Sequence, residues 1–345
     1  MPSEQNQNCL GKIKPKGCIL ILTLECIFKC RMCHLWRVAK DDSNAPSIAQ
    51  WKDFISSFDD FVEKGDCENK FTITFGGGEP LLREAELLEL VGFSSKRGYW
   101  ASIASNGYLF NPELTRKLID SGLHYLGLSL DSLHEKTHDS MRGVEGSHKK
   151  VLEIIEFLPG FKERPVLAVN AIIMKPNLDG ILELARWVDG KERISSLLLQ
   201  ALMQPFHDPT AEDWQKQGVY SGLWPDDAQK VKSVIDGLIE MKLSGDDNKP
   251  SKISNPVSQL ETFREYFTQQ KSFLEKIKCR VLESGFFSIS PNGDVNLCPF
   301  MDPIGNIKEA GIKQLWESGR AEEIRGRMLS CRNACHHLVN CWYEE

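Results

Sequence analysis

Three cysteines stand close together near the start of the chain, at Cys26, Cys30 and Cys33, in the spacing C-x3-C-x2-C. Thiolates bind both zinc and iron–sulfur clusters, and a closed site of either kind takes four protein ligands. Three thiols can therefore hold a four-iron cube while one iron stays open to a substrate or a second cofactor. Two alternatives remain: a structural zinc site that adds His34, and redox pairing, for which C-x2-C alone would suffice.

The apolar run Cys18–Leu24 leads directly into these cysteines. It is short, continuous and partly β-branched, which is typical of a strand buried on both faces rather than half-exposed. Strand-like and helix-like segments then alternate along the chain up to about residue 200. Such alternation predicts an α/β fold with a parallel sheet, either open or closed into a barrel. The further expected strands are residues 71–75, 100–104, 125–130, 166–173 and 194–199, and the expected helices are residues 46–64, 82–91, 112–121, 147–158 and 178–188.

A glycine-rich stretch, Gly76-Gly77-Gly78-Glu79-Pro80, follows the second expected strand. Glycines permit a close approach of the backbone, and a carboxylate is a suitable partner for an ammonium group. Taken alone, the run could equally be a turn. It does not have the G-x-G-x-x-G order of a dinucleotide site.

Polar residues also follow the later strands, at the end where β/α folds build their sites. Ser105-Asn106-Gly107 follows the third strand and could be a simple Asn-Gly turn. Ser129 and Asp131 end the fourth strand, and Arg142-Gly143 come after an expected loop that contains His138 and Asp139. A surface salt bridge is the alternative role for Arg142. Candidates to contact adenine or substrate at the ends of the last two strands are Asn170, Gln200 and Gln204.

A second group of cysteines lies at the other end of the chain. Cys279, Gly293 and Cys298 form C-x13-G-x4-C across an expected hairpin at residues 285–300, and Cys331, Cys335 and Cys341 form C-x3-C-x5-C. The chain has eleven cysteines, an odd number, and no secretion signal. This favours metal ligation in a reducing compartment over disulfides. A zinc site that includes His336 or His337 is the alternative.

Composition excludes several classes of function. The formal net charge is −6 and Lys and Arg form no run, so no electrostatic surface for nucleic acid is expected. The longest apolar run falls far short of the roughly 20 residues that a membrane span needs. The first residues have no signal-peptide core, and a cytoplasmic protein is expected.

Together these motifs resemble the radical S-adenosylmethionine (SAM) superfamily and its C-terminal SPASM/twitch extension. Met32 departs from the family, which usually has an aromatic residue there. The resemblance implies a partial (β/α)6 barrel with a small C-terminal α+β domain rich in cysteine. It divides the chain into an N-terminal tail (1–16), a core barrel (17–205), a mostly helical bridge (206–278) and an auxiliary cluster domain (279–345).

The resemblance also implies the cofactors and their residues. Cys26, Cys30 and Cys33 would hold a 4Fe–4S cluster whose open iron takes the amino and carboxylate groups of SAM. Glu79 would meet the amino group, Arg142 the carboxylate, and Ser129 and Asp131 the ribose. The full implied set of SAM-binding residues is Gly77, Gly78, Glu79, Asn106, Ser129, Asp131, Arg142 and Gln200. The implied ligands of one auxiliary 4Fe–4S cluster are drawn from Cys279, Cys298, Cys331, Cys335 and Cys341.

The implied function is the reductive cleavage of SAM to a 5′-deoxyadenosyl radical, which abstracts hydrogen from a small metabolite or a peptide and leads to oxidation or bond formation. A flavodoxin or ferredoxin would supply the electron. About sixteen residues precede the first strand, too few for a leader-recognition domain, so a peptide or protein maturase would work with a separate recognition partner. An alternative of another class is a non-catalytic iron–sulfur or zinc-binding redox sensor on the same fold.

Overall fold

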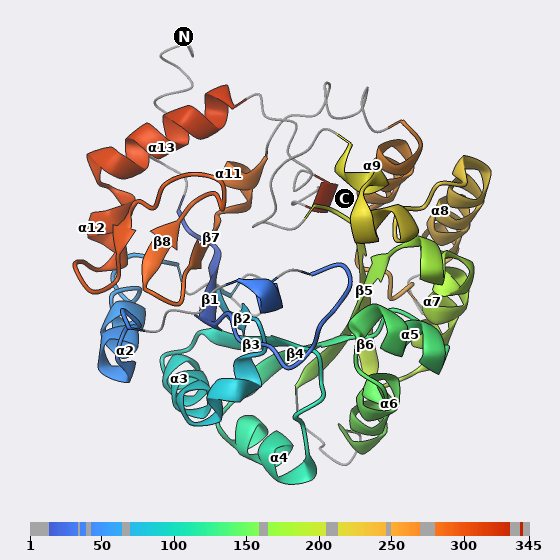
Figure 1. The fold of residues 1–345 in the computed structure, drawn as a ribbon. Helices are drawn as coiled ribbons and strands as arrows, with labels where there is room; N and C mark the ends of the chain where they lie inside the picture. The colour runs from blue at the N-terminus through green and yellow to red at the C-terminus, as the bar shows by residue number, and fades with distance from the viewer. Residues whose placement is uncertain are drawn as a thin grey trace.

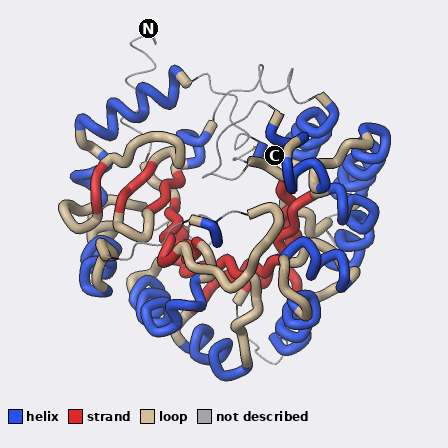
Figure 2. The backbone as a smooth tube through the Cα atoms, viewed as in Figure 1, coloured by secondary structure: helices blue, strands red, loops and turns tan. Residues whose placement is uncertain are grey.

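The computed structural model describes residues 14–33, 35–38, 43–63, 70–158, 165–204, 213–245, 250–269, 280–331 and 339–340. A curved nine-stranded sheet runs through them in the order β6-β5-β4-β3-β2-β1-β7-β8-β9, with helices ringed around its outer face (Figures 1 and 2). The strands are β1 Gly17–Thr23, β2 Thr72–Gly77, β3 Trp100–Ser105, β4 Leu123–Ser129, β5 Val166–Ile173, β6 Ile194–Ala201, β7 Phe286–Ile289, β8 Asp294–Asn296 and β9 Gly305–Asn306.

The six strands β1–β6 pair in sequence order, each parallel to the next. The predicted α/β fold with a partial barrel is therefore confirmed. The longer helices are α2 Ile48–Ser56, α3 Glu84–Lys96, α4 Pro112–Asp120, α5 Glu135–Arg142, α6 Ser147–Phe157, α7 Ile181–Gly190, α8 Ala228–Leu243, α9 Val257–Thr268 and α13 Gly319–Ser330. Short helices are α11 Val281–Ser284, α12 Ile312–Trp316, η1 Leu35–Arg37, η2 Pro80–Arg83, η4 Lys175–Gly180, η5 Trp214–Lys216 and η6 Gly218–Gly222.

Local sequence explains where several helices begin. Ser47 accepts a hydrogen bond from Gln50 N–H in a capping box at the start of α2, and Asn111 caps α4 just before Pro112. Such caps satisfy backbone N–H groups that the first turn of a helix leaves unpaired. The capping residues Ser47 and Asn111 therefore explain why α2 and α4 begin where they do.

The sheet has two unlike faces. The side chains that point outward, such as Leu20, Phe75 and Leu126, are fully buried beneath the helices. The alternate side chains point into the barrel and are more accessible: Ile19 on β1 is 40% exposed. The prediction of a strand buried on both faces was therefore wrong for β1, because the concave face of a partial barrel stays open. The hydrophobic core thus lies between the outer face of the sheet and the helices, and the inner face of the sheet is available to a ligand.

One helix was not expected. Residues 135–142 were predicted as loop, but they form α5, which ends at Arg142 with Gly143 in the left-handed conformation (φ 70°). Only His138 and Met141 are buried along it, so its sequence has no strong apolar period. Helix α5 determines where Arg142 lies.

The C-terminal strands continue the barrel sheet. Strand β7 pairs parallel to β1, β8 pairs antiparallel to β7, and β9 pairs antiparallel to β8. The hairpin expected at residues 285–300 is present, with Gly293 at φ 90° in its turn. Within the described part of the chain, no helix is long and apolar enough to cross a membrane.

Candidate functional site

The loop after β1 carries the three closely spaced cysteines. Cys30 is buried and Cys26 and Cys33 are half-buried. The loop is held by its own backbone, since Cys33 N–H donates to the Cys30 carbonyl (3.2 Å) and Phe28 N–H donates to the Cys26 sulfur (3.4 Å). The three thiols thus lie on one folded loop at the carboxyl end of the central strand. We call residues 24–33 the cluster loop.

The glycine-rich stretch after β2 clasps the start of the cluster loop. Gly78 N–H donates to the Thr23 carbonyl (2.8 Å) and Glu79 N–H donates to the Glu25 carbonyl (2.7 Å). A Cβ on Gly78 would lie 2.0 Å from the Glu25 oxygen, and one on Gly77 would lie 2.3 Å from the Thr23 oxygen. Both glycines are therefore required by close backbone approach, which couples this stretch to the position of the cluster loop.

The Glu79 carboxylate is completely buried beside the cluster loop. Its two oxygens accept hydrogen bonds from the Ser105 hydroxyl (2.8 Å), from Asn106 N–H (2.9 Å) and from Leu81 N–H (3.2 Å). Burial raises the pKa of Glu79 to about 7, against these three hydrogen bonds, which lower it. A buried carboxylate of this kind is ready to receive a positively charged or N–H-donating ligand.

Asn106 links the third strand to the cysteines. Its amide nitrogen lies 3.8 Å from the Cys26 sulfur, and its side-chain oxygen accepts from Tyr108 N–H (2.9 Å). The predicted Ser105-Asn106-Gly107 motif therefore lies against both Glu79 and the cluster loop. Hydrogen bonds to a cysteine sulfur are one means by which proteins adjust an iron–sulfur cluster.

The C-terminal end of α5 packs on the other side of the cluster loop. Arg31 N–H donates to the Met141 carbonyl (2.9 Å), and a Cβ on Gly143 would lie 2.6 Å from the Lys29 oxygen. Arg142 donates from Nε to Asp131 (2.6 Å), and its positive charge acts on the Cys30 thiol. Burial alone would lower the pKa of Arg142, but the charges of Asp131 and Cys30 raise it overall.

Asp131 has its oxygens engaged within the protein. Oδ2 accepts from Arg142 and Oδ1 accepts from Ile172 N–H (2.9 Å). Asp131 N–H donates to His138 Nδ1 (3.1 Å), and its carbonyl accepts from Asn177 (2.7 Å). In this arrangement Asp131 holds Arg142 against Cys30, and its predicted contact with ribose stays a prediction.

The donor set fits a cluster better than a single ion. Among the described residues, no three His, Cys, Asp or Glu side chains lie close enough together for one metal ion, whereas a cube spreads three thiolates over three different irons. His34, which the zinc alternative needs, lies outside the described residues. Burial raises the pKa of Cys30 to about 12, although Arg142 lowers it, and burial also raises the pKa of Cys26 and Cys33. Metal binding must therefore displace their protons.

Family comparisons agree with this geometry. The model of the radical SAM superfamily matches residues 20–188, and the model of an iron–sulfur cluster-binding domain, SPASM, matches residues 279–342. The chain belongs to the radical SAM superfamily. The predicted membership is confirmed, and with it the use of SAM, a 4Fe–4S cluster and a SPASM-type cluster region. It is a radical SAM enzyme.

Individual relatives differ in what they make. The chain is 25% identical over 291 residues to an AdoMet-dependent heme synthase of Methanosarcina barkeri, covering 79% of this chain and 77% of that protein. It is 27% identical over 164 residues to a PqqA peptide cyclase of Bradyrhizobium diazoefficiens, covering 48% of this chain and 40% of that protein. The crystal structure of Streptococcus suis SuiB bound to S-adenosylmethionine shares the fold with a TM-score of 0.65 and 16% identity, over 89% of this chain and 66% of that one.

The remaining predicted residues of this radical SAM enzyme lie near the barrel mouth. Ser129 is the last residue of β4 and pairs with Asn170, three residues before the end of β5, and Gln200 is next to last in β6. Gln204 is buried just beyond that strand. The structure therefore brings Ser129, Asn170 and Gln200 to the same end of the sheet as the cluster loop, and their roles stay predictions.

Only part of the predicted auxiliary site is described. Cys298 follows β8 and Cys331 ends α13, and both are half-buried. Asp302 accepts from Arg327 (3.0 Å), which ties the loop after Cys298 to the last turn of α13, where Cys331 follows. The other predicted ligands, Cys279, Cys335 and Cys341, lie outside the described residues.

Two residues that support the site were assigned no role from the sequence. His138, on the unexpected helix α5, is completely buried, and burial lowers its pKa to about 4, so it accepts the Asp131 N–H as a neutral imidazole. Asn177 donates to the carbonyls of Asp131 and Ile172 (2.7 and 2.9 Å). Recognising α5 would have placed His138 one turn before Arg142, but nothing in the sequence around Asn177 indicates its partner.

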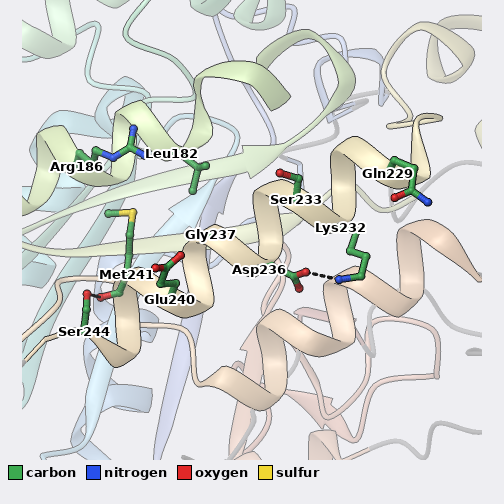
Figure 3. A pocket seen from close by; sticks show the side chains of 10 residues that line it. All are labelled: Leu182, Arg186, Gln229, Lys232, Ser233, Asp236, Gly237, Glu240, Met241 and Ser244. Carbon is green, nitrogen blue, oxygen red and sulfur yellow. Dashed lines mark hydrogen bonds and ion pairs between the residues drawn. The ribbon is translucent and has the colours of Figure 1, made fainter.

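A groove of about 800 Å³ lies on the outside of the barrel. It runs between α7 and α8, and Figure 3 shows Arg186, Lys232, Asp236 and Glu240 along it. Lys232 and Asp236 are paired with each other. The groove is on the helical side of the sheet and has no part in the site of this radical SAM enzyme.

Proposed function

We propose that this chain generates a 5′-deoxyadenosyl radical at the cluster loop and uses it to abstract hydrogen from a peptide, leading to oxidation or bond formation on that peptide. The observation that carries the proposal is the clasp between Gly78-Glu79 and Thr23-Glu25. It places a buried carboxylate beside three thiols at the open end of the barrel.

The chain's own side chains prepare the site for its cofactors. Cys26, Cys30 and Cys33 would hold the cluster, and Arg142 would stabilise the Cys30 thiolate, because a guanidinium next to a sulfur favours its charged form. When bound, the cluster and SAM supply a one-electron reductive cleavage that yields methionine and a carbon radical able to abstract hydrogen. The buried side chains of Phe28 and Met32 (1% and 6% exposed) exclude water from the back of the cluster loop.

Glu79 is the residue proposed to orient SAM through its amino group. The carboxylate is fixed by Ser105 and Asn106, so little rotational freedom is lost when a ligand binds. Asn106, Ser129, Asp131, Arg142 and Gln200 are proposed to complete the SAM site; Gly77 and Gly78 would do so through their backbone.

The inner wall of the barrel supports a substrate whose reacting part is uncharged. None of the strands β1–β6 contains Asp, Glu, Lys or Arg. The inward side chains supply hydroxyls and carboxamides, among them Ser102, Ser129, Asn170 and Gln200, with Ile19 as an exposed apolar side chain. Such groups suit the amide groups and small side chains of a peptide, whereas a carboxylate-rich substrate such as a tetrapyrrole would call for cations.

A peptide substrate is also in keeping with the peptide cyclase among the relatives, although this chain spans less than half of that protein. The auxiliary cluster, held by four of Cys279, Cys298, Cys331, Cys335 and Cys341, would accept one electron from the substrate radical, so that hydrogen abstraction and this electron transfer together make a net two-electron oxidation. A separate recognition partner for the peptide, and a flavodoxin or ferredoxin as electron donor, complete the proposal.

Hydrogen transfer to 5′-deoxyadenosine tests the substrate class. The reconstituted enzyme is incubated anaerobically with SAM, dithionite and one of two deuterated peptides of equal length. One peptide has an uncharged centre of Ser, Thr, Asn and Val, and the other carries Asp and Glu at the same positions. We expect deuterium in 5′-deoxyadenosine, detected by mass spectrometry, with the uncharged peptide above the acidic one. Deuterium transfer from a deuterated tetrapyrrole and from neither peptide would refute the peptide assignment, while leaving SAM cleavage itself intact.

A further inference from the structure

Strand β6 ends the barrel sheet on one side, and its outer edge is nevertheless paired. A free edge strand presents unpaired N–H and C=O groups at every second residue. Along this outer edge, the backbone groups of Leu197, Leu199 and Ala201 bond to partners outside the sheet. Each of these three has both its N–H and its C=O engaged in the described structure.

The first of the three is paired by backbone. Leu197 N–H donates to the Lys252 carbonyl (2.7 Å), and its own carbonyl accepts from Ser254 N–H (2.9 Å). Residues 252–254 therefore act as a short parallel bridge centred on Ile253. This bridge covers only the lower part of the edge.

Carboxamide side chains pair the other two residues. Asn255 accepts from Leu199 N–H and donates to the Leu199 carbonyl, both at 2.8 Å. Asn340 makes the same two contacts with Ala201, also both at 2.8 Å. A carboxamide carries a donor and an acceptor side by side, as a peptide group does, so each asparagine replaces one residue of a missing strand.

The two asparagines belong to one hydrogen-bond chain. Asn255 donates to Gln259 Oε1 (2.8 Å), and Gln259 Nε2 donates to the Val339 carbonyl (3.3 Å). The Val339 side chain is completely buried, and its partner Gln259 lies on α9 (Figure 1). Residues 339–340 are thus docked on the barrel although they belong to the SPASM region of the sequence.

The docking point is at the functional end of the barrel. Ala201 is the last residue of β6, and parallel strands end together at the mouth that carries the cluster loop. Asn340 directly precedes Cys341, one of the proposed auxiliary ligands. The contact therefore joins Asn340, one residue before this cysteine in the sequence, to the barrel across 139 residues of sequence.

We propose that Asn340 is a positioning residue for the auxiliary cluster. With Asn255 and Gln259 it forms a carboxamide clamp that holds residues 339–340 at the end of β6, and the auxiliary cluster assembles only when this contact is made. This inference rests on the proposed auxiliary cluster and its cysteine ligands. It adds that the contact between Asn340 and the edge of β6 is needed for those ligands to bind the cluster. Asparagine is required because its amide group both accepts from Ala201 N–H and donates to the Ala201 carbonyl. Aspartate would place a second acceptor oxygen against that carbonyl, and alanine has neither a donor nor an acceptor.

Iron content and local hydrogen exchange test the clamp together. The background carries Cys26→Ala, Cys30→Ala and Cys33→Ala, so that iron reports on the C-terminal cysteines alone, about four per chain for one cube. Asn340→Asp and Asn340→Ala are compared in this background with Asn296→Asp. Asn296 lies in the same region, and among the described residues its side chain donates to the nearby Asp294 carbonyl (3.0 Å), so it is the matched control.

We expect both Asn340 variants to hold less than half the iron of the background after anaerobic reconstitution, and the Asn296 variant to hold all of it. Amide exchange in the segment 199–203 should become about fivefold faster in the Asn340→Ala variant, because the side-chain oxygen that accepts from Ala201 N–H is lost. Exchange in β5 should stay unchanged, which shows that the barrel is folded; the alanine variant repeats the test without adding a charge.

Full iron content in folded Asn340 variants with faster exchange would overturn the positioning role. Unchanged exchange at 199–203 would show that the contact does not protect Ala201 and would overturn it as well. A background that holds no iron even with Asn340 intact would reject the auxiliary ligands themselves and the clamp with them. Loss of SAM cleavage is not a readout here, so failure of the radical chemistry is tested separately.

Discussion

Replacing Gly78 with alanine should dislodge the cluster loop, whereas the same change at Gly76 should not. A Cβ on Gly78 would lie 2.0 Å from the Glu25 oxygen and 2.7 Å from the Leu24 carbonyl carbon, both backbone atoms of the cluster loop. A Cβ on Gly76 would find its nearest neighbour, Ile19 Cγ2, at 3.8 Å. Neither glycine has a positive φ, so the difference between them is steric.

The size of the effect follows from the contacts. Since Cβ atoms do not approach other atoms within 3.0 Å, the loop must move by about 1 Å, more than the roughly 0.5 Å that a preorganised site tolerates. The movement breaks the hydrogen bonds from Gly78 and Glu79 to Thr23 and Glu25, worth about 1 kcal/mol each. Overpacking adds about 1–3 kcal/mol. We therefore expect Gly78→Ala to lower the free energy of unfolding by about 3–5 kcal/mol.

Two assays compare the variants. Chemical denaturation of the metal-free proteins should show the loss for Gly78→Ala and a change below about 1 kcal/mol for Gly76→Ala, which fits its space. After anaerobic reconstitution, SAM cleavage to 5′-deoxyadenosine should fall about a hundredfold in Gly78→Ala, as expected for a displacement of 1 Å in a reactive site. Equal stability and equal cleavage rates in the two variants would refute the clasp.

Three further variants probe the site. Cys30→Ala should abolish production of 5′-deoxyadenosine, because one of three thiolates is lost; undiminished production would sink the cluster assignment. Burial raises the pKa of Glu79 in the folded, metal-free protein from its ordinary value of 4.5 to about 7, so the parent loses stability as the pH rises from 5 to 8. The Glu79→Gln variant has no such carboxyl group, and its free energy of unfolding relative to the parent should therefore rise by about 2–3 kcal/mol over this range. Denaturation midpoints that change in parallel with pH in the two proteins would contradict this. Arg142→Ala should cost about 3–5 kcal/mol, since it leaves the fully buried Asp131 unpaired; a second change, Asp131→Asn, should restore most of the loss, and no restoration would exclude the pair as its cause.

Local patterns were enough to predict most of the barrel. Strand β5 was expected at residues 166–173 and is found there, because a short, mostly apolar run rich in Val and Ile is typical of a buried strand. Helix α2 was expected as far as Lys64 but ends at Ser56, and residues 64–69 lie outside the described part. Helix α5 was missed because only His138 and Met141 are buried along it. A helix that packs through two side chains shows too few apolar residues for a helical repeat of hydrophobicity to be recognised.

The candidate site divides in a similar way. The spacing of Cys26, Cys30 and Cys33 identifies the cluster loop, since three ligands on one short loop need no long-range information. The hydrogen-bond partners of Glu79 could not be predicted from the sequence. Its partners Ser105 and Asn106 are 26 and 27 residues away, and only the pairing of β2 with β3 brings them together.

By itself, the sequence determined the type of fold, the cysteine loop, the glycine-rich stretch and the superfamily, because each depends on residues that are neighbours in the chain. The tertiary structure decided which partners the polar and charged side chains of the site bind. Arg142 lies against Asp131 and Cys30 because α5 ends on the cluster loop, and Asn340 reaches Ala201 because β6 is the last strand of an unclosed barrel. Contacts of this kind depend on where whole elements pack, and no local pattern encodes the packing of an edge that is completed by a side chain 139 residues away.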